Sequence, residues 1–233
     1  MKKRVLLSWS SGKDCAWALH YLRRQDDVEL LGLYTTINEA FDRVAMHAVR
    51  VELVRMQAEA LGLPVQFLSI PWPCSNDDYK AVMAGFVASA KEQGVTHMAF
   101  GDLFLKDIRQ YREEQLAGTG IEPLFPLWER PTDELSQEMI EQGLQAIITC
   151  VDPKQLDSKF AGQLYDRGLL SRLPEGVDAC GENGEFHSFV FDGPMFTTPV
   201  SMHSGPVVER DGFVFADVLP WIDKNKAIIN NMI

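Results

Sequence analysis

Short apolar runs alternate with amphipathic stretches along the first half of the chain. Between these runs, apolar residues recur at helical spacing, which predicts helices over residues 14–25, 47–61, 76–93 and 103–116. The apolar runs are bounded by turn-forming residues and predict strands over residues 4–9, 29–35, 65–70 and 96–100, with a short extended piece at 122–126. Strands that alternate with helices indicate βαβ units and a parallel sheet, whose ligands bind at the carboxyl ends of the strands.

The pattern changes after Pro126. A helix is predicted over residues 132–142, with Thr132 as its cap, followed by a buried strand over 144–151 and a second helix over 161–171. A loop rich in glycine and acidic residues follows, and then two strand-like runs, the second containing an Asp211-Gly212 turn that predicts a hairpin. We therefore predict an α/β fold with residues 1–128 as one part and 129–233 as a smaller α+β part. No Gly/Ser linker separates them, so we expect them to pack as one body.

Composition narrows the class of protein. Hydrophobic residues make up 46% of the chain and charged residues 24%, which excludes wholesale disorder. No apolar run approaches the roughly 20 residues of a membrane helix, and the run behind the basic N-terminus is too short for a signal peptide, so we expect a cytoplasmic protein with no membrane partner. A net charge of −11 argues against nucleic acid as a partner. The four cysteines have no metal-binding spacing and are expected to be free thiols.

The stretch SWSSGKDC, residues 8–15, carries the clearest chemistry. It lies between a predicted buried strand and a predicted helix, where successive backbone N–H groups and the helix dipole favour an anion. Lys13 adds a full charge, and Ser10 and Ser11 add hydroxyl donors. The stretch is not a Walker A loop, because Leu7 and Asp14 stand where that motif needs Gly and Ser or Thr. The alternative is a capped helix with an exposed lysine.

Residues 10–15 resemble the PP-loop SGGKDS of the N-type ATP pyrophosphatases, with Ser11 in place of a glycine and Cys15 in place of the final serine. Ser11 matters only if the backbone there needs a positive φ, and Cys15 is a weaker donor than a hydroxyl. Residues 177–194 resemble the EGxGGEFHTFVxDGP signature of the diphthine–ammonia ligase family, and residues 43–47 and 100–113 fit the same family. The resemblance extends from the first strand to about Phe196.

This resemblance implies a Rossmann-like, adenine-nucleotide-α-hydrolase-like fold, with an ATP-binding domain at 1–128 and a substrate-binding part at 129–233. It also implies an ATP-dependent C–N ligase that amidates a carboxylate through an acyl-adenylate and releases AMP and pyrophosphate. The implied cofactors are ATP and Mg²⁺, and the implied partners are ammonia and a carboxylate on a small molecule or a modified protein side chain. Named members amidate diphthine on elongation factor 2. A bacterial branch, toward which Cys15 and Cys180 point, lacks that substrate, and a role in cobalamin salvage has been proposed for some of its members.

The resemblance also assigns roles to individual residues. The implied catalytic residues are Lys13, Glu182, Glu185 and His187. Asp14 is implied to bind Mg²⁺. The implied substrate-binding residues are Arg109, Arg112, Glu113 and Asn183. The implied ATP-binding residues are Ser10, Ser11, Gly12, Lys13, Asp14, Cys15, Tyr34, Thr35, His47, Gly101 and Asp102.

Most of these positions also have a purely structural interpretation. Asp14 is a common helix cap, Gly101-Asp102 a common turn pair, and a lone His47 is more often structural than functional. Arg109, Arg112 and Glu113 share a helical face, which is more often a solvated, salt-bridged surface. The acidic loop that contains Glu182 is, without the family signature, a solvated turn.

Three alternative functions remain at the level of sequence. One is an amidating enzyme of cobalamin salvage. The second is a tRNA-thiolating PP-loop enzyme, which needs a basic face and usually catalytic cysteines. The third is a nucleotide-binding regulator without catalysis, which has no evident need for the block from Glu182 to His187. The apolar tail, residues 214–218 and 228–233, is expected either to cover a sheet edge or to form a homodimer contact.

Overall fold

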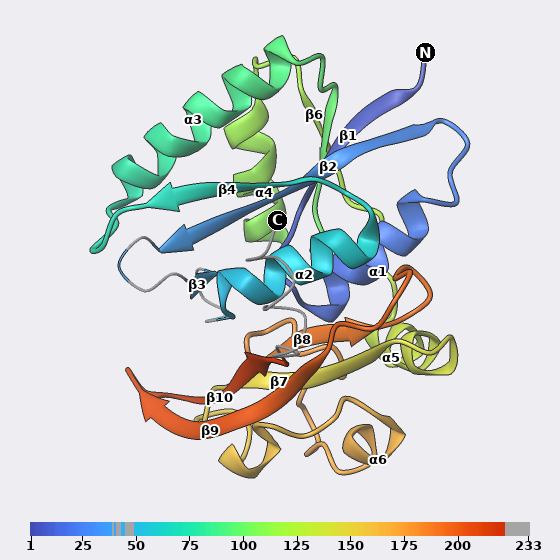
Figure 1. Ribbon diagram of the computed structural model, residues 1–233, viewed down its shortest axis with the longest axis vertical. Coiled ribbons are helices and arrows are strands. Elements are labelled where there is room, and N and C mark those ends of the chain that lie inside the picture. Colours follow the sequence, from blue (N-terminus) through green and yellow to red (C-terminus); the bar gives the residue numbers. More distant parts are fainter. Residues whose placement is uncertain (39, 41–42, 45–48, 222–233) are drawn as a thin grey trace, which may run out of the picture.

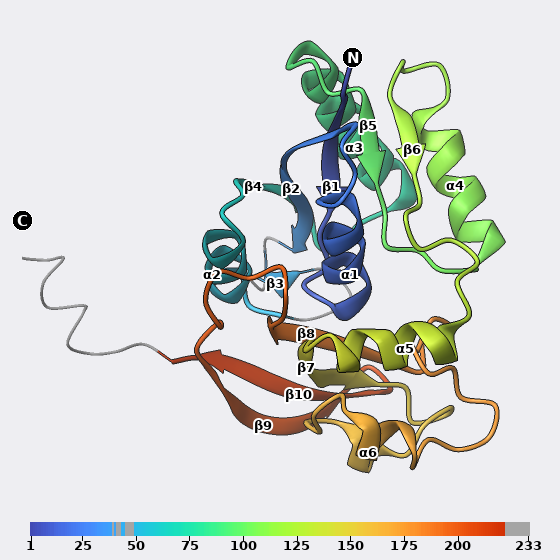
Figure 2. The same ribbon diagram turned by 90° about the vertical axis from the view of Figure 1, so that its right-hand side faces the viewer.

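The computed structural model describes residues 1–38, 40, 43–44 and 49–221. Two sheets lie one above the other, with helices α1 (Lys13–Leu22) and α2 (Val51–Leu61) between them. Helices α3 (Asn76–Glu92) and α4 (Lys106–Leu116) cover the far face of the first sheet (Figure 1). Turning the molecule by 90° shows the second sheet beneath α1 and α2 (Figure 2). The two helices α1 and α2 therefore lie against both sheets.

The first sheet is the predicted Rossmann-like parallel sheet. Its strands run in the order β3-β2-β1-β5-β6, with β4 paired to β2, and every pairing except β2–β3 is parallel. The strands are β1 (Lys3–Ser8), β2 (Val28–Asn38), β3 (Arg43–Val44), β4 (Val65–Ile70), β5 (His97–Ala99) and β6 (Glu122–Leu124). The apolar residues of the central strands β1 and β5 are buried on both faces, as expected of a parallel sheet between helices.

The second sheet is antiparallel and lies in the C-terminal part, with strand order β8-β7-β10-β9. Its strands are β7 (Gln145–Val151), β8 (Phe186–Asp192), β9 (Met202–Arg210) and β10 (Phe213–Pro220). Helix α5 (Thr132–Glu141) precedes it, and the predicted hairpin at Asp211-Gly212 joins β9 to β10. One hydrophobic cluster contains Trp17 and Leu53 from the first part and Phe189 from the second, so the two parts share a core. The boundary near residue 128 stays a prediction.

Two of the predictions for the second half are wrong. Thr132 does not cap its helix, because Pro131 occupies the N-cap position and the Thr132 hydroxyl donates to the Asp178 carboxylate instead. The helix predicted over 161–171 is reduced to α6 (Arg167–Leu170), preceded by the 3₁₀ turn η1 (Ser158–Phe160). Residues 162–165 are drawn into extended pairing with β7, where Gly162 N donates to Ile148 O at 2.8 Å and Tyr165 N donates to Ala146 O at 2.8 Å.

Other expectations are refined rather than overturned. The long third helix is capped by Ser75, which forms a reciprocal capping box with Asp78. The helix expected from residue 47 begins at Val51, and His47 lies outside the described residues. Residues 214–218 belong to β10, an interior strand, so they cover no edge, while residues 228–233 lie outside the described part of the chain. None of the helices that the structure describes is both long and apolar enough to cross a membrane.

The buried side-chain amide of Gln57 links the two parts of the fold. Gln57, on the buried face of α2, is fully inaccessible to solvent. Its Oε1 accepts from the Trp9 indole N–H at 2.8 Å. Its Nε2 donates to Ser11 O at 3.1 Å and to Val190 O, on β8, at 2.6 Å. One side chain therefore links α2, the loop after β1 and the second sheet.

We predict that Gln57→Leu lowers the free energy of unfolding by about 2–5 kcal/mol, because it leaves the Trp9 indole N–H and the Val190 carbonyl buried without a partner. Urea denaturation followed by circular dichroism measures the change. Gln110→Leu is the matched control, since Gln110 is exposed on α4, and its effect should stay within about 0.5 kcal/mol. Equal midpoints for Gln57→Leu and the wild type would contradict the prediction.

Candidate active site

A cavity of about 250 Å³ lies at the carboxyl ends of β1 and β5, as expected for ligands of a parallel sheet. The second sheet closes it from the other side through residues of β8 and of the loop before it. The lining therefore comes from three segments far apart in the chain. It includes Ser10, Gly12, Lys13, Asp14, Cys15, Gly101, Asp102, Arg112, Glu182, His187 and Ser188.

The phosphate-loop candidate is held against β8 by close backbone contacts. Ser11 has a φ of 70°, the left-handed conformation that glycine adopts most easily, so the serine at this position does carry a conformational cost. Ser11 O accepts from Val190 N at 2.9 Å, and Lys13 N donates to Ser188 Oγ at 3.2 Å. A side chain on Gly12 would place its Cβ 3.2 Å from Ser188 O, so glycine permits this approach.

The start of α1 lacks a side-chain cap. Gly12 is the N-cap residue, and Asp14 lies in the first turn, so Asp14 is not the cap. An uncapped helix start directs unsatisfied N–H groups and the positive end of the dipole toward the cavity. This is the arrangement that favours an anion at this position.

Lys13 is buried, with only 2% of its surface exposed. Its ammonium contacts Asp14 Oδ2 at 2.9 Å, donates to Cys180 O, and lies over the Tyr165 and Phe186 rings. Burial lowers the pKa of Lys13, but the groups around it, first of all the Asp14 carboxylate, together outweigh this and raise the pKa above the usual value. Lys13 therefore stays charged and ties the phosphate loop to the loop before β8.

Cys15 makes a local contact instead of offering its thiol to a ligand. Its Sγ donates to Gly12 O at 3.1 Å and accepts from Ser10 Oγ at 3.4 Å. Burial raises the pKa of the Cys15 thiol to about 11, so it is neutral at pH 7. The Cys15 S–H and the Ser10 O–H are both used within the loop, so a phosphate contact there would come from backbone N–H groups. All four cysteines are free, as predicted.

Gly101 and Asp102 follow β5 and contribute differently to the cavity. A Cβ on Gly101 would lie 2.8 Å from Cys15 N, so glycine is required here by the protein's own backbone. Burial raises the pKa of Asp102, and the Arg112 guanidinium, with Nε 3.6 Å from Asp102 Oδ2, opposes that shift. Asp102 and Arg112 thus form an ion pair on one wall of the cavity.

Glu182 is the acidic residue of the signature that faces the cavity. Its Oε1 accepts from Leu103 N at 2.7 Å and from Phe104 N at 3.4 Å, and this bond replaces the helical turn predicted at residues 103–105. Burial and the nearby Asp14 carboxylate raise the pKa of Glu182 to about 7, although the bond from Leu103 opposes the shift. A carboxyl that titrates near neutral pH can both take and return a proton.

His187 lines the same cavity from β8. Burial, with a smaller contribution from the Lys13 charge, lowers the pKa of His187 to about 4, so its imidazole is neutral at pH 7. Its backbone carbonyl accepts from Thr149 Oγ1 at 3.4 Å. The structure therefore brings Lys13, Glu182 and His187 together around one space.

The signature motif suggests that Glu185 and Asn183 lie in the cavity beside Glu182, but their side chains form hydrogen bonds within the loop instead. Glu185 is buried, and its Oε1 accepts from Asp178 N at 2.9 Å and from Asn183 Nδ2 at 3.0 Å. Neither residue belongs to the lining of the cavity. Both hold the shape of the loop that presents Glu182, and their direct roles in catalysis and substrate binding stay predictions.

Arg109, Arg112 and Glu113 were predicted on one face of α4. They also differ in whether they line the cavity. Arg109 pairs with Glu113, with Nε 2.7 Å from Oε1, and stacks over the Phe125 and Trp128 rings. This pair does not line the cavity, which matches the salt-bridged surface given as the alternative interpretation. Arg112 alone turns inward, over the Phe100 ring.

The predicted adenine contacts lie deeper in the fold. Tyr34 O accepts from Trp9 N at 2.8 Å, and Thr35 is buried in β2. The Tyr34 ring lines a smaller cavity of about 50 Å³ between α3 and α4, which shares Phe100 and Arg112 with the larger one. Contacts between this region and a nucleotide base stay a prediction.

Two residues of the site were not singled out from the sequence. Gln57 was detectable as a polar residue on the apolar stripe that contains Val54, Ala58 and Leu61. Ser188 lies inside the signature itself, next to His187, and its hydroxyl accepts the Lys13 amide. Both act on backbone groups of the phosphate loop, a kind of contact that periodicity does not reveal.

Among the described residues, the cavity offers a metal ion at most two carboxylate ligands at one place. The described residues contain no group of three or more His, Cys, Asp or Glu placed to hold a metal by themselves. Asp14 Oδ1 is buried without a hydrogen-bond partner among the described residues, and Asp102 lines the same cavity. This fits Mg²⁺, which commonly binds one or two carboxylates together with substrate phosphates and water.

Comparisons with known proteins agree with the resemblance seen in the sequence. Residues 1–121 match the model of the diphthamide synthase N-terminal domain, and residues 131–214 match that of the diphthamide synthase C-terminal domain. Diphthine–ammonia ligase of Bos taurus is 28% identical over 242 residues, which cover 92% of this chain and 88% of that protein. The Homo sapiens and Danio rerio proteins of the same name are 27% and 28% identical, covering 78% of this chain and 73% and 77% of their own lengths.

These matches extend over both parts of the fold and include the phosphate loop and the loop that presents Glu182. They confirm the predicted family and the predicted class of enzyme, a ligase, and the family implies the use of ATP. The chain belongs to the diphthamide synthase family.

Proposed function

We propose that this chain amidates a carboxylate with ammonia, using ATP to form an acyl-adenylate and releasing AMP and pyrophosphate. The observation that carries the proposal is the shared cavity, in which an anion-binding helix start, the charged Lys13 and the titratable Glu182 face one another. The relatives are named for ammonia ligation to diphthine, and the carboxylate of this chain's own acceptor is assigned by that analogy.

The first half-reaction requires the triphosphate to lie with its α-phosphate exposed to the acceptor carboxylate. The Lys13 amide is already bound to Ser188 and the Ser10 hydroxyl donates to Cys15 Sγ, so the amides of Asp14 and Cys15 are the donors we assign to phosphate oxygens. The Lys13 ammonium has three N–H donors, of which Asp14 and Cys180 O take two, leaving one for phosphate. A preorganised donor of this kind contributes about 2.7–4 kcal/mol to the transition state.

Magnesium fits this arrangement as a partner of the nucleotide. Asp14 Oδ1 and Asp102 are the groups that would hold it together with phosphate oxygens. Bound there, Mg²⁺ would neutralise part of the charge on the phosphates. Arg112 would keep Asp102 ionised for this role.

The second half-reaction is attack of ammonia on the acyl-adenylate. The attacking nitrogen must lose a proton before AMP can leave as the amide forms. Glu182, with its pKa near 7 and its carboxylate fixed by the Leu103 amide, is the base that we assign to this proton. His187, neutral at pH 7, is assigned to orient the carboxylate or the ammonia by hydrogen bonding.

The alternative functions fit these observations less well. A thiolating enzyme would need a reactive thiolate, but burial raises the pKa of both Cys15 and Cys180, the two thiols that line the cavity. A non-catalytic regulator would give no use to a buried carboxyl held with a pKa near 7. Whether the acceptor is diphthine or, as in cobalamin salvage, a small molecule is decided by a substrate screen.

We predict that Lys13→Met lowers the rate of AMP formation from ATP at least 100-fold, because one phosphate donor and the local positive charge are lost. Chromatography of the nucleotides measures AMP and ADP separately, with ammonia and candidate carboxylates supplied. Lys159→Met, at a lysine whose side chain is 66% exposed, is the control and should keep the wild-type rate. A wild-type enzyme that yields ADP instead of AMP would exclude the adenylate route.

We predict that kcat/KM rises with pH between about 6 and 8 and then levels off, because the base form of Glu182 is the ionised one and its pKa is about 7. The free ammonia concentration is held constant across the series, so that ammonium titration does not imitate the effect. Glu182→Gln should remove the inflection and slow the reaction roughly 100-fold or more. Glu175→Gln, an exposed position in the preceding loop, should keep both the rate and the inflection.

A further inference from the structure

The loop before β8 is held by the carboxylate of Asp178, a residue outside the lining of the active-site cavity. Asp178 Oδ2 accepts from Cys180 N and from Glu182 N, each at 3.0 Å. The first of these bonds is an Asx turn, in which a side-chain oxygen takes the place of a backbone carbonyl. One oxygen atom therefore holds both ends of the tripeptide from Cys180 to Glu182.

The other oxygen of this carboxylate is tied to helix α5. Asp178 Oδ1 accepts from the hydroxyl of Thr132, the first residue of α5. The backbone of Asp178 is fixed as well, because its N–H donates to Glu185 Oε1 at 2.9 Å and its carbonyl accepts from Gly181 N at 2.9 Å. The direction of the carboxylate is therefore set by groups of the C-terminal part.

Both ends of the tripeptide carry groups that take part in the proposed reaction. The carbonyl of Cys180 accepts from the Lys13 ammonium, so the position of this carbonyl affects where the charge of Lys13 lies. At the other end, Glu182 Oε1 accepts from the Leu103 amide at 2.7 Å. Asp178 acts on both groups through the backbone, by fixing the amides of residues 180 and 182.

Other contacts hold the tripeptide but do not replace these two bonds. Cys180 Sγ donates to Thr132 O at 3.5 Å, and Ala179 O accepts from the Tyr165 hydroxyl at 2.9 Å. These contacts use a thiol and a carbonyl, whereas the two amides have the Asp178 carboxylate as their acceptor. Without that acceptor the amides would need water as a partner, and the tripeptide would move to reach it.

We propose that Asp178 is a positioning residue that places Lys13 and Glu182 relative to each other, so that one carboxylate serves both half-reactions. The inference rests on the proposed function, from which it takes the phosphate donor and the proton acceptor. Asp178 acts here as a hydrogen-bond acceptor. An asparagine can do the same, with its oxygen toward the two amides and its NH₂ toward the Thr132 hydroxyl oxygen.

The test measures the two sides of the site separately on the full-length protein. Calorimetric titration with α,β-methylene-ATP and Mg²⁺ reports on the phosphate side. The ¹³C signal of the Glu182 carboxyl, identified by its loss in Glu182→Gln, reports the titration of that group. The charges of Asp14, Lys13 and Asp102 act on this carboxyl, and every variant used to test the inference keeps all three.

We expect Asp178→Ala to weaken binding of the analogue about fivefold or more, because the Lys13 ammonium is no longer held in place. The pKa of Glu182, about 7 in the wild type, should fall to about 6 or below, because burial is the main cause of its elevation and the loosened tripeptide admits water. AMP formation should slow roughly 100-fold. Asp178→Asn should stay within about threefold of the wild type, because Asn and Asp accept backbone N–H bonds about equally well.

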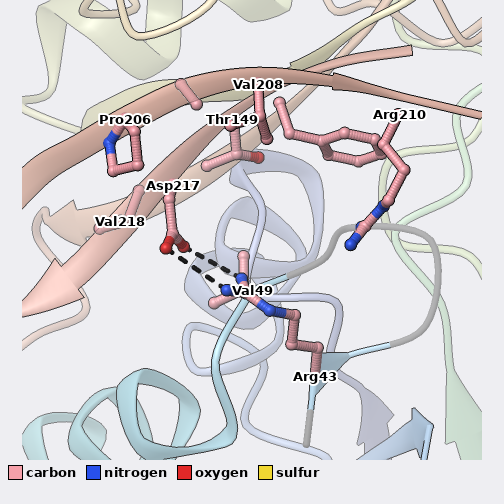
Figure 3. Close-up of a pocket in the computed structure, with 10 residues that line it drawn as sticks. Arg43, Val49, Thr149, Pro206, Val208, Arg210, Asp217 and Val218 are labelled. Carbon is pink, nitrogen blue, oxygen red and sulfur yellow. Dashed lines mark hydrogen bonds and ion pairs between the residues drawn. The ribbon is translucent and has the colours of Figure 1, made fainter. Parts of the chain in front are cut away.

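A second variant and a control separate positioning from general loosening. Thr132→Val keeps Asp178 but removes the hydroxyl that orients it, and should lower the affinity and the Glu182 pKa less than Asp178→Ala does. Asp217→Ala is the control. Asp217 joins the two parts of the fold in a separate cavity of about 110 Å³, where it binds Arg43 (Figure 3). Its loss should lower the unfolding midpoint but leave the analogue affinity and the Glu182 pKa unchanged.

Circular dichroism establishes that each variant is folded. The inference is overturned if folded Asp178→Ala keeps the wild-type affinity and titration, if Asp178→Asn loses as much as Asp178→Ala, or if Asp217→Ala changes the site equally. Should Asp178→Ala fail to fold, wild-type values in Thr132→Val overturn it. A wild-type protein that binds the analogue but forms no AMP contradicts the proposed function instead, while affinity and titration still test the positioning.

Discussion

The contact between the loop after β1 and the strand β8 is the constraint on which the rest of the structure depends. Gln57 donates to both Ser11 O and Val190 O, and Val190 N donates to Ser11 O. These bonds hold Ser11 in its left-handed conformation and so determine where the start of α1 points. Because the partners are buried, loss of the Gln57 amide would leave the Trp9 indole N–H and the Val190 carbonyl without a partner in the core.

The same contact makes the second sheet part of the candidate active site. Lys13 reaches Cys180 O, its amide meets Ser188, and Glu182 is held by the amides that follow β5. The C-terminal part therefore supplies the residue that titrates near neutral pH, and the first part supplies the groups suited to phosphate. Desolvation at this junction both keeps Glu182 partly protonated and keeps His187 neutral. Neither part could produce this cavity alone.

The face of the second sheet carries two cavities with different chemistry. Over β8, the lining is suited to phosphate and proton transfer, whereas over β9 and β10 it combines arginines with valines. The Thr149 hydroxyl donates to the carbonyl of His187, so one hydrogen bond links residues of the two linings.

The sequence predicted those features of the fold and the site that are caused by residues close together in the chain. The strand at 65–70, the helix that begins after Ser75, the loop at residues 8–15 and the family signature were all predicted, because periodicity and loop chemistry act over a few residues. The short pattern around Glu182 was likewise found without its structure.

Tertiary structure decided the rest. Residues 162–165 pair with β7 instead of continuing a helix, Glu185 turns into its own loop while Glu182 faces the cavity, and Arg112 turns inward while Arg109 does not. Ser11 takes a positive φ because β8 and Gln57 hold its carbonyl. The partner that sets the outcome lies 7 residues away for Glu185 and 10 for Arg112, but 46 residues away for Ser11, whose carbonyl meets Gln57. The sequence by itself predicted the family, the parallel sheet and the loop after the first strand, whereas burial and the hydrogen bonds of the folded chain determined which of the candidate side chains share one space.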